Sequence, residues 1–436
     1  MDRQTRSICP VCLRRIPAEY AEKDGNVYLE KSCPEHGSFR TILWRGKPSI
    51  EEWLCEETLT PPKISDRDVR LGCPYDCGMC SRHLQEACCT MIEITSRCTF
   101  GCPICFAGSE PSGTDMSLAR YSSILDDLIC RNPVNRFNIQ LSGGEPADHP
   151  DLVEFVRLAH EKGFPYIQIN SNGKRLAEDP DFCTELKAAG LNSVFLQFDG
   201  TDDSIYLKMR SQSLLSLKKR AIASCRESGL SVVLSVALIP GINTQDIGNC
   251  IRFGIANMPT VRGIHFLPVS YMGRLYQDEP KDEDRFTLPE LIRSIAAQTH
   301  FQISPSDLLP ITSGSCFCGL YGNFLIDPDT GSITSVSESN GGCCPCKEDA
   351  ISSARKYLAR RWGKTVEEVG DDWDLFSKQA EDRGFSITSM PFMDAWNFDE
   401  NRLRRCRLQV PTADGRMIPF CAFHVTNTRG ERLYHG

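Results

Sequence analysis

The stretch CTFGCPICF at residues 98–106 carries three cysteines, Cys98, Cys102 and Cys105, and ends on an aromatic residue, Phe106. It follows the apolar run MIEIT at residues 91–95, which is typical of a buried strand. Zinc sites and most iron–sulfur clusters are closed by four protein ligands. Three thiolates on one short loop therefore indicate a metal site with one coordination position left open.

Strand-like and helix-like segments alternate around and after this loop. Strands are predicted at 91–95, 136–144, 166–173, 193–200, 230–241 and 263–270, and helices at 116–130, 150–163, 181–190, 211–228, 244–257 and 288–299. Such repeated strand-then-helix units predict a parallel sheet, either doubly wound or curled into a barrel. Because the unusual residues follow the carboxyl ends of the strands, as in barrels, we predict an α/β fold with a partial (β/α)6 barrel.

The open position suits a small molecule. If Cys98, Cys102 and Cys105 hold a catalytic [4Fe–4S] cluster, S-adenosylmethionine can chelate its fourth iron through amino and carboxylate groups. The glycine turn SGGEP at 142–146, with Gly143, Gly144 and Pro146, suits close approach to that amino group, and Glu145 offers a carboxylate. These motifs resemble the signature of the radical S-adenosylmethionine superfamily. In such a site one electron cleaves the sulfonium and yields a 5′-deoxyadenosyl radical, which takes hydrogen from an unreactive carbon.

Bulk composition excludes several classes of protein. The chain has 436 residues, a net charge of −8 and a pI of about 5.6, so nothing electrostatic directs it to nucleic acid. We identify neither a signal peptide nor a transmembrane segment, and expect a cytoplasmic protein. With 23 cysteines and no export signal, thiolates bound to metal are a better interpretation than disulfides.

Two further cysteine groups precede the barrel. Cys73, Cys77 and Cys80 repeat the spacing of the first loop, and Cys88 or Cys89 would complete an auxiliary [4Fe–4S] cluster; we favour Cys88. Cys9, Cys12 and Cys33 resemble the knuckles of a rubredoxin or zinc ribbon. His36 or Cys55 would be the fourth ligand, and the ion would be zinc or mononuclear iron.

The C-terminal part offers another ligand set. A further cubane is predicted at Cys316, Cys318, Cys406 and Cys421, with Cys343, Cys344 and Cys346 as alternative ligands. We also predict a helix at 349–361 and a strand at 417–425, and treat Cys130, Cys183, Cys225 and Cys250 as small buried hydrophobic residues. The predicted domains are a metal-binding domain (1–58), an auxiliary iron–sulfur segment (59–90), the radical barrel (91–300) and an auxiliary-cluster domain (301–436).

A resemblance covers nearly the whole chain. The motifs ICPVC, SCPEHG, GCPYDCGMCSRH, IEITSRCTFGCPICFA, QLSGGEP, VFLQFDG and TADGRMIPFCAF occur in this order. Together they resemble the archaeal tetraether lipid synthase family, described earlier as a methylase of 6-hydroxymethyl-dihydropterin. The resemblance implies auxiliary [4Fe–4S] clusters and carbon–carbon bond formation at unactivated sp³ carbon. It also implies that Asn170, Asn172, Asp199 and Ser235 contact S-adenosylmethionine.

Three functions follow as hypotheses. The first is radical coupling of lipid chains, and the second is radical methyl transfer to a pterin or similar small molecule. The third is an iron–sulfur electron-transfer protein without catalysis. As partners we expect a small-molecule or lipid substrate and a low-potential donor such as ferredoxin or flavodoxin; peripheral membrane contact stays open. A lipid chamber needs an apolar lining, whereas a pterin pocket needs paired donors and acceptors.

Overall fold

A computed structural model describes residues 3–57, 59–65, 68–132, 137–275, 279–312, 314–337 and 382–434. The helix predicted at 349–361 and the cysteines at 343, 344 and 346 lie outside these residues. Within the described ranges, no helix combines the length and the apolar character that crossing a bilayer requires.

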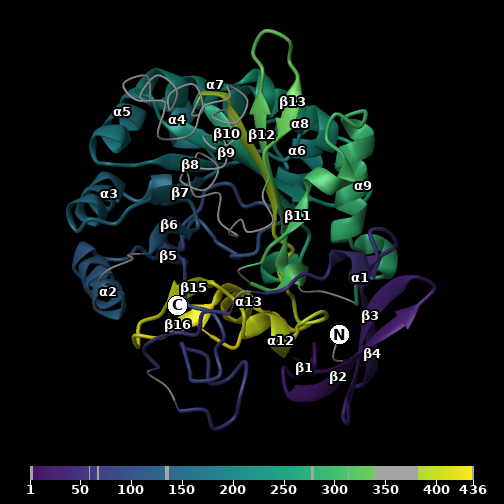
Figure 1. The fold of residues 1–436 in the computed structure, drawn as a ribbon. Helices are drawn as coiled ribbons and strands as arrows, with labels where there is room; N and C mark the ends of the chain where they lie inside the picture. Colours follow the sequence, from purple (N-terminus) through teal and green to yellow (C-terminus); the bar gives the residue numbers. More distant parts are fainter. Residues whose placement is uncertain are drawn as a thin grey trace, which may run out of the picture.

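The N-terminal part is an antiparallel four-stranded sheet (Figure 1) with the order β1-β2-β3-β4. Its strands are β1 Gln4–Ile8, β2 Arg15–Lys23, β3 Asn26–Cys33 and β4 Gly37–Arg45, followed by helix α1 Ile50–Trp53. Strands β2 and β3 form a hairpin across Asp24 and Gly25. Both turn residues have positive φ, 53° and 73°, which an Asp-Gly pair tolerates well.

The middle of the chain forms the curved parallel sheet that the alternation predicted. Strands β5 to β10 lie side by side in chain order, each parallel to the next. The strands are β5 Cys89–Thr95, β6 Asn138–Gly143, β7 Ile167–Ser171, β8 Ser193–Gln197, β9 Ser231–Leu238 and β10 Val261–Pro268. The helices are α2 Leu118–Arg131, α3 Leu152–Glu161, α4 Lys174–Glu178, α5 Pro180–Ala188, α6 Asp203–Arg210, α7 Leu215–Ser228, α8 Ile247–Ala256 and α9 Leu288–Gln298. They cover the outer face, so the partial-barrel prediction holds (Figure 1).

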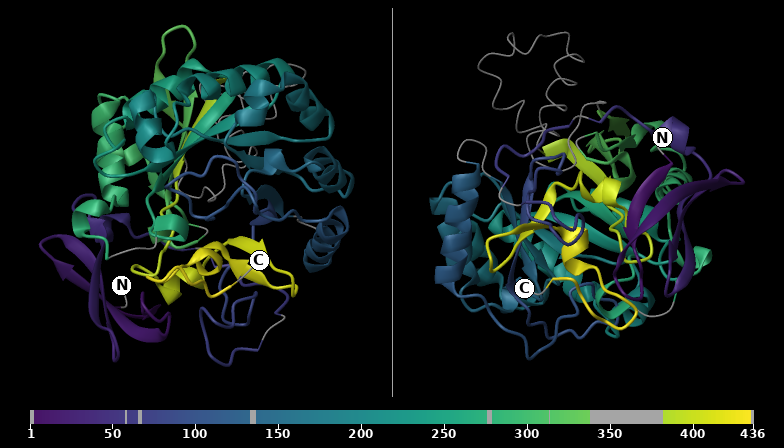
Figure 2. Two further views of the ribbon diagram at one scale, coloured as in Figure 1. Left: turned by 180° about the vertical axis from the view of Figure 1, so that it is seen from behind. Right: turned by 90° about the horizontal axis from the view of Figure 1, so that it is seen from below.

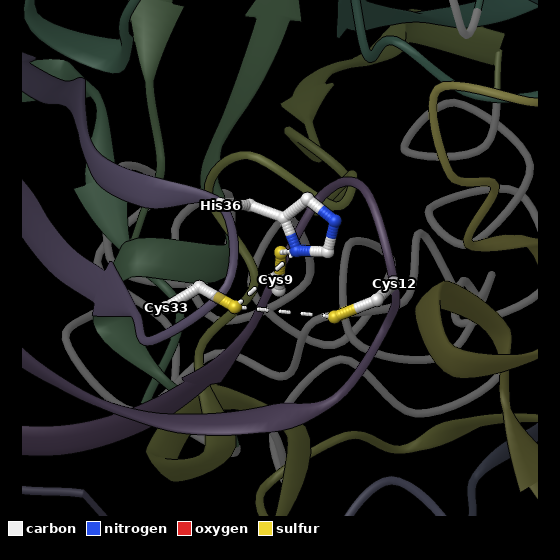
Figure 3. Close-up of side chains that lie close together, drawn as sticks. All are labelled: Cys9, Cys12, Cys33 and His36. Carbon is white, nitrogen blue, oxygen red and sulfur yellow. Dashed lines mark hydrogen bonds between the residues drawn. The ribbon is translucent and has the colours of Figure 1, made fainter.

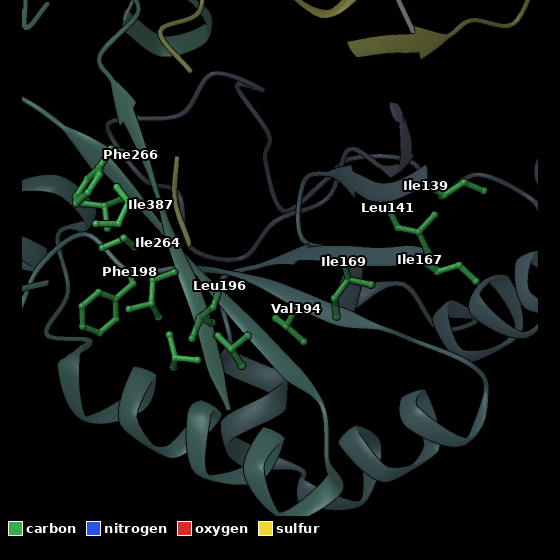
Figure 4. Close-up of a cluster of buried hydrophobic side chains, with 14 of the residues drawn as sticks. Ile139, Leu141, Ile167, Ile169, Val194, Leu196, Phe198, Ile264, Phe266 and Ile387 are labelled. Atoms are coloured by element: carbon green, nitrogen blue, oxygen red, sulfur yellow. The ribbon is translucent and has the colours of Figure 1, made fainter. Parts of the chain in front are cut away.

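Apolar side chains fill the space between the sheet and the helices on its outer face (Figure 4). Alternate residues of each strand point at the helices, and those side chains are apolar and fully buried. Examples are Leu141, Ile169, Val194 and Leu196, each 0% exposed. Burial of such side chains contributes about 1.5–3 kcal/mol each. The residues between them must face the inner side, because the side chains of a strand alternate.

Residues after 300 add strands to both edges of this sheet. On one edge β14 Gly384–Ser389 runs parallel to β10 and antiparallel to β12 Leu320–Ile326, with the short β11 Leu309–Pro310 and β13 Ile333–Ser335 beside β12. On the other edge β15 Leu408–Pro411 runs parallel to β5, and β16 Met417–Pro419 pairs with β15. Short helices α12 Glu400–Leu403 and α13 Phe420–His424 complete the segment.

The strand predicted at 417–425 is wrong beyond Pro419. The chain turns there into α13, and all five of its residues are buried. A short run that is apolar at every position has no periodicity that distinguishes a buried strand from a buried helix. The C-terminal segment lies across one end of the curved sheet and next to the N-terminal sheet (Figure 2). There the buried amine of Lys31 donates to the carbonyl of Ala395 at 2.6 Å.

Candidate metal and cofactor centre

The three-cysteine loop leaves the carboxyl end of β5. Cys102 is buried, while Cys98 and Cys105 are half-buried. Burial raises the pKa of the Cys98 thiol to about 11, and the nearby charges of Glu145, Cys102 and Cys105 act in the same direction. The pKa of the Cys102 thiol is also raised, chiefly by burial, and iron would take such thiols as thiolates. Three buried or half-buried thiols on one short loop fit three corners of a cubane.

Three guanidinium groups from distant parts of the chain hold this loop through its carbonyl oxygens. Arg210 donates to the carbonyl of Ile104 at 2.6 Å, and Arg274 donates to that of Cys102 at 2.8 Å. Arg432 donates to the carbonyls of Phe106 at 3.2 Å and of the adjoining Ala107 at 2.8 Å. Arg274 also donates its backbone N–H to the carbonyl of Cys105 at 2.9 Å. Sequence analysis missed all three arginines, because they lie more than 100 positions from their acceptors and belong to no spacing pattern.

The glycine turn after β6 packs directly on the chain that leaves β5. A Cβ on Gly143 would lie 2.1 Å from the carbonyl oxygen of Thr95, and one on Gly144 would lie 1.9 Å from that of Arg97. Any side chain would therefore separate the two loops. The glycines bring the SGGEP turn against the cluster loop, which is a role in addition to the predicted approach to a cofactor.

The Glu145 carboxylate points into the protein rather than across the turn. It accepts hydrogen bonds from Ser171 Oγ at 2.7 Å and from the backbone N–H groups of Asn172 and Ala147 at 2.6 and 3.1 Å. Burial raises its pKa to about 7, although these donors act in the opposite direction. Glu145 thus ties the turn after β6 to the end of β7. Pro146 begins the adjoining short helix, η1 Pro146–Asp148, and is also buried.

The other predicted cofactor contacts lie at the ends of neighbouring strands. Asn170 donates Nδ2 to Ser142 Oγ at 3.3 Å, and its buried Oδ1 has no partner among the described residues. The carbonyl of Asn172 accepts from Nζ of the fully buried Lys218 at 2.5 Å. Ser235 is half-buried on β9. Phe106 is 37% exposed and lies with its ring 5.0 Å from that of His424.

Asp199 is different, because its carboxylate is already paired. It is 0% exposed and forms a two-point ion pair with Arg210, at 2.6 Å and 2.9 Å. Since Arg210 also holds the loop at Ile104, this pair connects the end of β8 to the cluster loop. Asp199 therefore acts through Arg210 on the loop.

The inner face of the sheet is polar. Gln140 donates to Gln168 at 2.9 Å, and Gln168 donates to Ser193 at 2.7 Å. On the far side His265 lies 2.7 Å from Thr388. Parallel strands covered on both faces are ordinarily apolar throughout, whereas here the inner positions include polar side chains beside apolar ones such as Phe195. The interior of the partial barrel is therefore lined with donors and acceptors.

The N-terminal sheet holds a compact ligand group (Figure 3). The Sγ atoms of Cys9, Cys12 and Cys33 and a ring nitrogen of His36 all lie within 4.8 Å of one another. His36 Nδ1 is 3.5 Å from Cys33 Sγ and 3.7 Å from Cys9 Sγ. Three sulfurs and one nitrogen suit a tetrahedral zinc or iron ion. Cys55, the alternative to His36, lies instead near Cys316, where it contributes to raising the pKa of the Cys316 thiol.

The His36→Ala variant is expected to lose one metal ion per chain, because three remaining thiols do not close a tetrahedral site. His300→Ala, which removes an exposed histidine elsewhere, should keep the full metal content. Elemental analysis of both purified variants measures this. Equal metal content in the two variants would exclude His36 as a ligand.

The remaining cysteines fall into two groups. The thiols of Cys73 and Cys77 interact directly, and Cys80 lies near enough to raise the pKa of the Cys77 thiol. Cys88 is half-buried, while Cys89 is buried at the start of β5. A cubane binds each cysteine to a different iron, so its sulfurs lie farther apart than the ligands of a single ion. Within the described residues, only the N-terminal group is close enough for one ion.

The C-terminal thiols converge from separate segments. Cys421 and Cys318 raise the pKa of the Cys406 thiol, and Arg402 donates Nε to Cys318 Sγ at 3.5 Å. Cys316 is buried beside them. Of the cysteines interpreted as small hydrophobic residues, Cys183, Cys225 and Cys250 are buried, but Cys130 is exposed. That part of the prediction is wrong because Cys130 lies on the solvent side of α2.

Comparison with known proteins adds the following. Residues 1–45 match the HMPTM N-terminal zinc ribbon domain, and residues 92–254 match the radical SAM superfamily. The chain is 32% identical to the 7,8-dihydro-6-hydroxymethylpterin dimethyltransferase of Methanocaldococcus jannaschii, over 97% of this chain and 94% of that protein. It is 27% identical to the GTP 3′,8-cyclase of Nautilia profundicola, over 40% and 55% of the two chains.

Solved structures resemble the chain over about half its length. SuiB of Streptococcus suis bound to its precursor peptide SuiA has a TM-score of 0.41 at 15% identity, over 50% of this chain and 47% of that one. Methylornithine synthase has a TM-score of 0.39 at 16% identity, over 52% and 65% of the chains.

Proposed function

Because the chain belongs to the radical S-adenosylmethionine superfamily, in the family of the archaeal 7,8-dihydro-6-hydroxymethylpterin dimethyltransferase, we propose that it transfers a one-carbon unit to a small polar ring compound. The chain is a radical enzyme that uses S-adenosylmethionine and a [4Fe–4S] cluster. The electron-transfer hypothesis without catalysis is therefore set aside. What stays open is the substrate.

When bound, the cluster and S-adenosylmethionine supply a radical that removes a hydrogen atom from an unactivated carbon. In our proposal Cys98, Cys102 and Cys105 hold the cluster, and Asn170, Asn172 and Ser235 contact S-adenosylmethionine. The arginines that donate to the loop carbonyls hold the three thiolates in fixed positions relative to one another. The covered inner face excludes water, which would otherwise compete for hydrogen bonds to the substrate.

The observation that carries the choice of substrate is the polar inner face. Gln140, Gln168, Asn170 and His265 occupy positions where a lipid chamber would need apolar side chains. Buried polar groups favour substrates that pair with them and discriminate strongly against those that do not. In our proposal this polar wall supports a pterin-like substrate ahead of lipid-chain coupling. The relative's name also refers to a hydroxymethylpterin.

We further propose that Cys73, Cys77, Cys80 and Cys88 hold an auxiliary cluster for electron entry from a ferredoxin or flavodoxin. Cys318, Cys406, Cys421 and Cys316 would hold another. The proximity of Cys73 and Cys80 to Cys77, and of Cys318 and Cys421 to Cys406, supports both assignments. Cys9, Cys12, Cys33 and His36 would hold the single zinc or iron ion.

The substrate is tested with anaerobically reconstituted full-length protein, dithionite and S-adenosylmethionine. With 6-hydroxymethyl-7,8-dihydropterin present, we expect 5′-deoxyadenosine together with a pterin product that carries additional methyl groups, both detected by mass spectrometry. Release of 5′-deoxyadenosine without any altered pterin, in the presence of a suitable one-carbon donor, would contradict the proposed substrate.

Lipid-chain coupling is the second candidate, and one observation favours it. Apolar side chains, among them Met91, Ile418 and Phe420, pack between the inner side of β5 and the C-terminal segment that carries Cys421. Such a surface would suit an alkyl chain beside a thiolate-rich site. Mass spectrometry of molecules that copurify with the protein separates the candidates: bound lipid and coupled chains favour this one, and bound pterin favours the first.

A further inference from the structure

A carboxylate and an imidazole meet on the inner face of the sheet next to the cluster loop. Glu93 lies on β5, five positions before Cys98. Its neighbours Ile92 and Ile94 belong to the core under the helices, each 0% exposed, so Glu93 points to the opposite, inner side. Its side chain keeps 24% of its surface exposed.

His424 of α13 faces this carboxylate. Its Nε2 lies 3.2 Å from Glu93 Oε1, and the imidazole is 0% exposed. Neither ring nitrogen of His424 makes a hydrogen bond within the described part of the chain, and neither does Oε1 of Glu93. Burial acts to raise the pKa of the Glu93 carboxyl, but His424 and then Arg432 hold it below its usual value. The carboxylate is thus ionised, with Oε1 facing His424.

Another unpartnered polar atom, on Asn170, lies along the same row of the sheet. Glu93 is in register with Ser142 of β6, and Ser142 accepts the amide of Asn170 on β7. The buried Oδ1 of Asn170 has no partner among the described residues. Unpaired buried acceptors cost about 1–3 kcal/mol each. Beside the partly exposed Glu93 carboxylate, the acceptor of Asn170 on the same inner wall indicates that a ligand supplies the missing donors.

Aromatic rings lie beside the pair formed by Glu93 and His424. The ring of His424 is 5.0 Å from that of Phe106 and 4.4 Å from that of Phe420. Since Phe106 directly follows Cys105, the pair is adjacent to the loop on which the radical chemistry is proposed to begin. A flat ring bound to the Glu93 carboxylate would therefore lie close to that loop and near the partly exposed ring of Phe106.

We propose that Glu93, supported by His424, binds the edge of a planar nitrogen heterocycle that presents two adjacent N–H donors, such as a 2-amino-4-oxopyrimidine ring. The two oxygens of an ionised carboxylate match a ring N–H and a neighbouring amino group, in the paired geometry that carboxylates form with guanidinium groups. His424 holds the carboxylate in place from the other side. The inference rests on the proposed function and identifies how its substrate class is recognised.

The test uses binding rather than turnover. Pterin and lumazine are the probes, because both are fluorescent pteridines and only pterin carries the 2-amino group. Anaerobic titrations of the reconstituted full-length protein with each probe are expected to show pterin binding roughly ten- to one-hundred-fold more tightly, since hydrogen bonds to a charged group contribute about 1.5–3 kcal/mol.

The Glu93→Gln variant should lose this preference, and Glu93→Asp, which keeps the charge, should retain part of it. His424→Gln should weaken pterin binding less than Glu93→Gln. Glu161→Gln, which changes an exposed carboxylate at the end of α3, should behave as the unchanged protein. Iron content and thermal unfolding show whether each variant is loaded and folded.

Equal affinity of the unchanged protein for both probes would overturn the inference, as would an undiminished preference in Glu93→Gln. Either result leaves the proposed function standing if an altered pterin still forms in the turnover assay. Conversely, a pterin preference that depends on Glu93, without any turnover of pterin, would contradict the proposed function and not the binding site.

Discussion

Cys98→Ala is expected to reduce the release of 5′-deoxyadenosine from S-adenosylmethionine to the level of protein without iron. Two remaining cysteines cannot hold a cubane that already has one iron without a protein ligand. The variant should also lose about four iron atoms per chain. Iron analysis and quantification of 5′-deoxyadenosine after reduction with dithionite measure the two effects.

Cys130→Ala is the matched control, because it removes an exposed cysteine from α2 and leaves all proposed ligands intact. It should retain both the iron and the activity. If Cys98→Ala releases 5′-deoxyadenosine as fast as Cys130→Ala, the loop at 98–106 does not hold the catalytic cluster.

Arg210→Ala is expected to lower the free energy of unfolding by about 3–5 kcal/mol, the usual cost of leaving a buried charge without its partner. Asp199 is 0% exposed and has Arg210 as its ion-pair partner, so its carboxylate would stay buried and uncompensated. The loop carbonyl of Ile104 would lose its donor as well. Denaturant unfolding and amide hydrogen exchange across residues 98–106 measure both consequences.

Two comparisons make this result specific. Arg157→Ala breaks an exposed ion pair with Glu154 and should leave stability unchanged, because such pairs are screened by water. The double variant Arg210→Met with Asp199→Leu removes both charges and should recover most of the stability. A double variant as unstable as Arg210→Ala alone would mean that the loss arises from packing rather than from the unpaired carboxylate.

Local patterns were enough to predict the scaffold. Each strand of the sheet is a short apolar run and each helix an amphipathic one, so the periodicity of neighbouring residues indicated the six parallel strands and their order. The metal-binding loops are equally local, because Cys98, Cys102 and Cys105 lie within eight positions. The hairpin around Asp24 and Gly25 follows from the φ angles that only such residues tolerate well.

Contacts between distant segments lay beyond that reasoning. Sequence left His36 and Cys55 equal as fourth ligands, and only the folded N-terminal sheet brings His36 to the three thiols. The same limit explains why α13 was predicted as a strand, because its apolar residues are buried by segments that no local period reveals.

By itself, then, the sequence determined that this chain is a radical S-adenosylmethionine barrel with cysteine-rich flanks, because periodicity and cysteine spacing are properties of neighbouring residues. The tertiary structure alone decided what surrounds the site. It placed Arg210 against the cluster loop from 106 positions away, and His424 against Glu93 from the other end of the chain. It also showed that polar side chains line the inner face. The alternating side chains of a strand belong to an inner or an outer face only after the sheet curves and the helices cover one side.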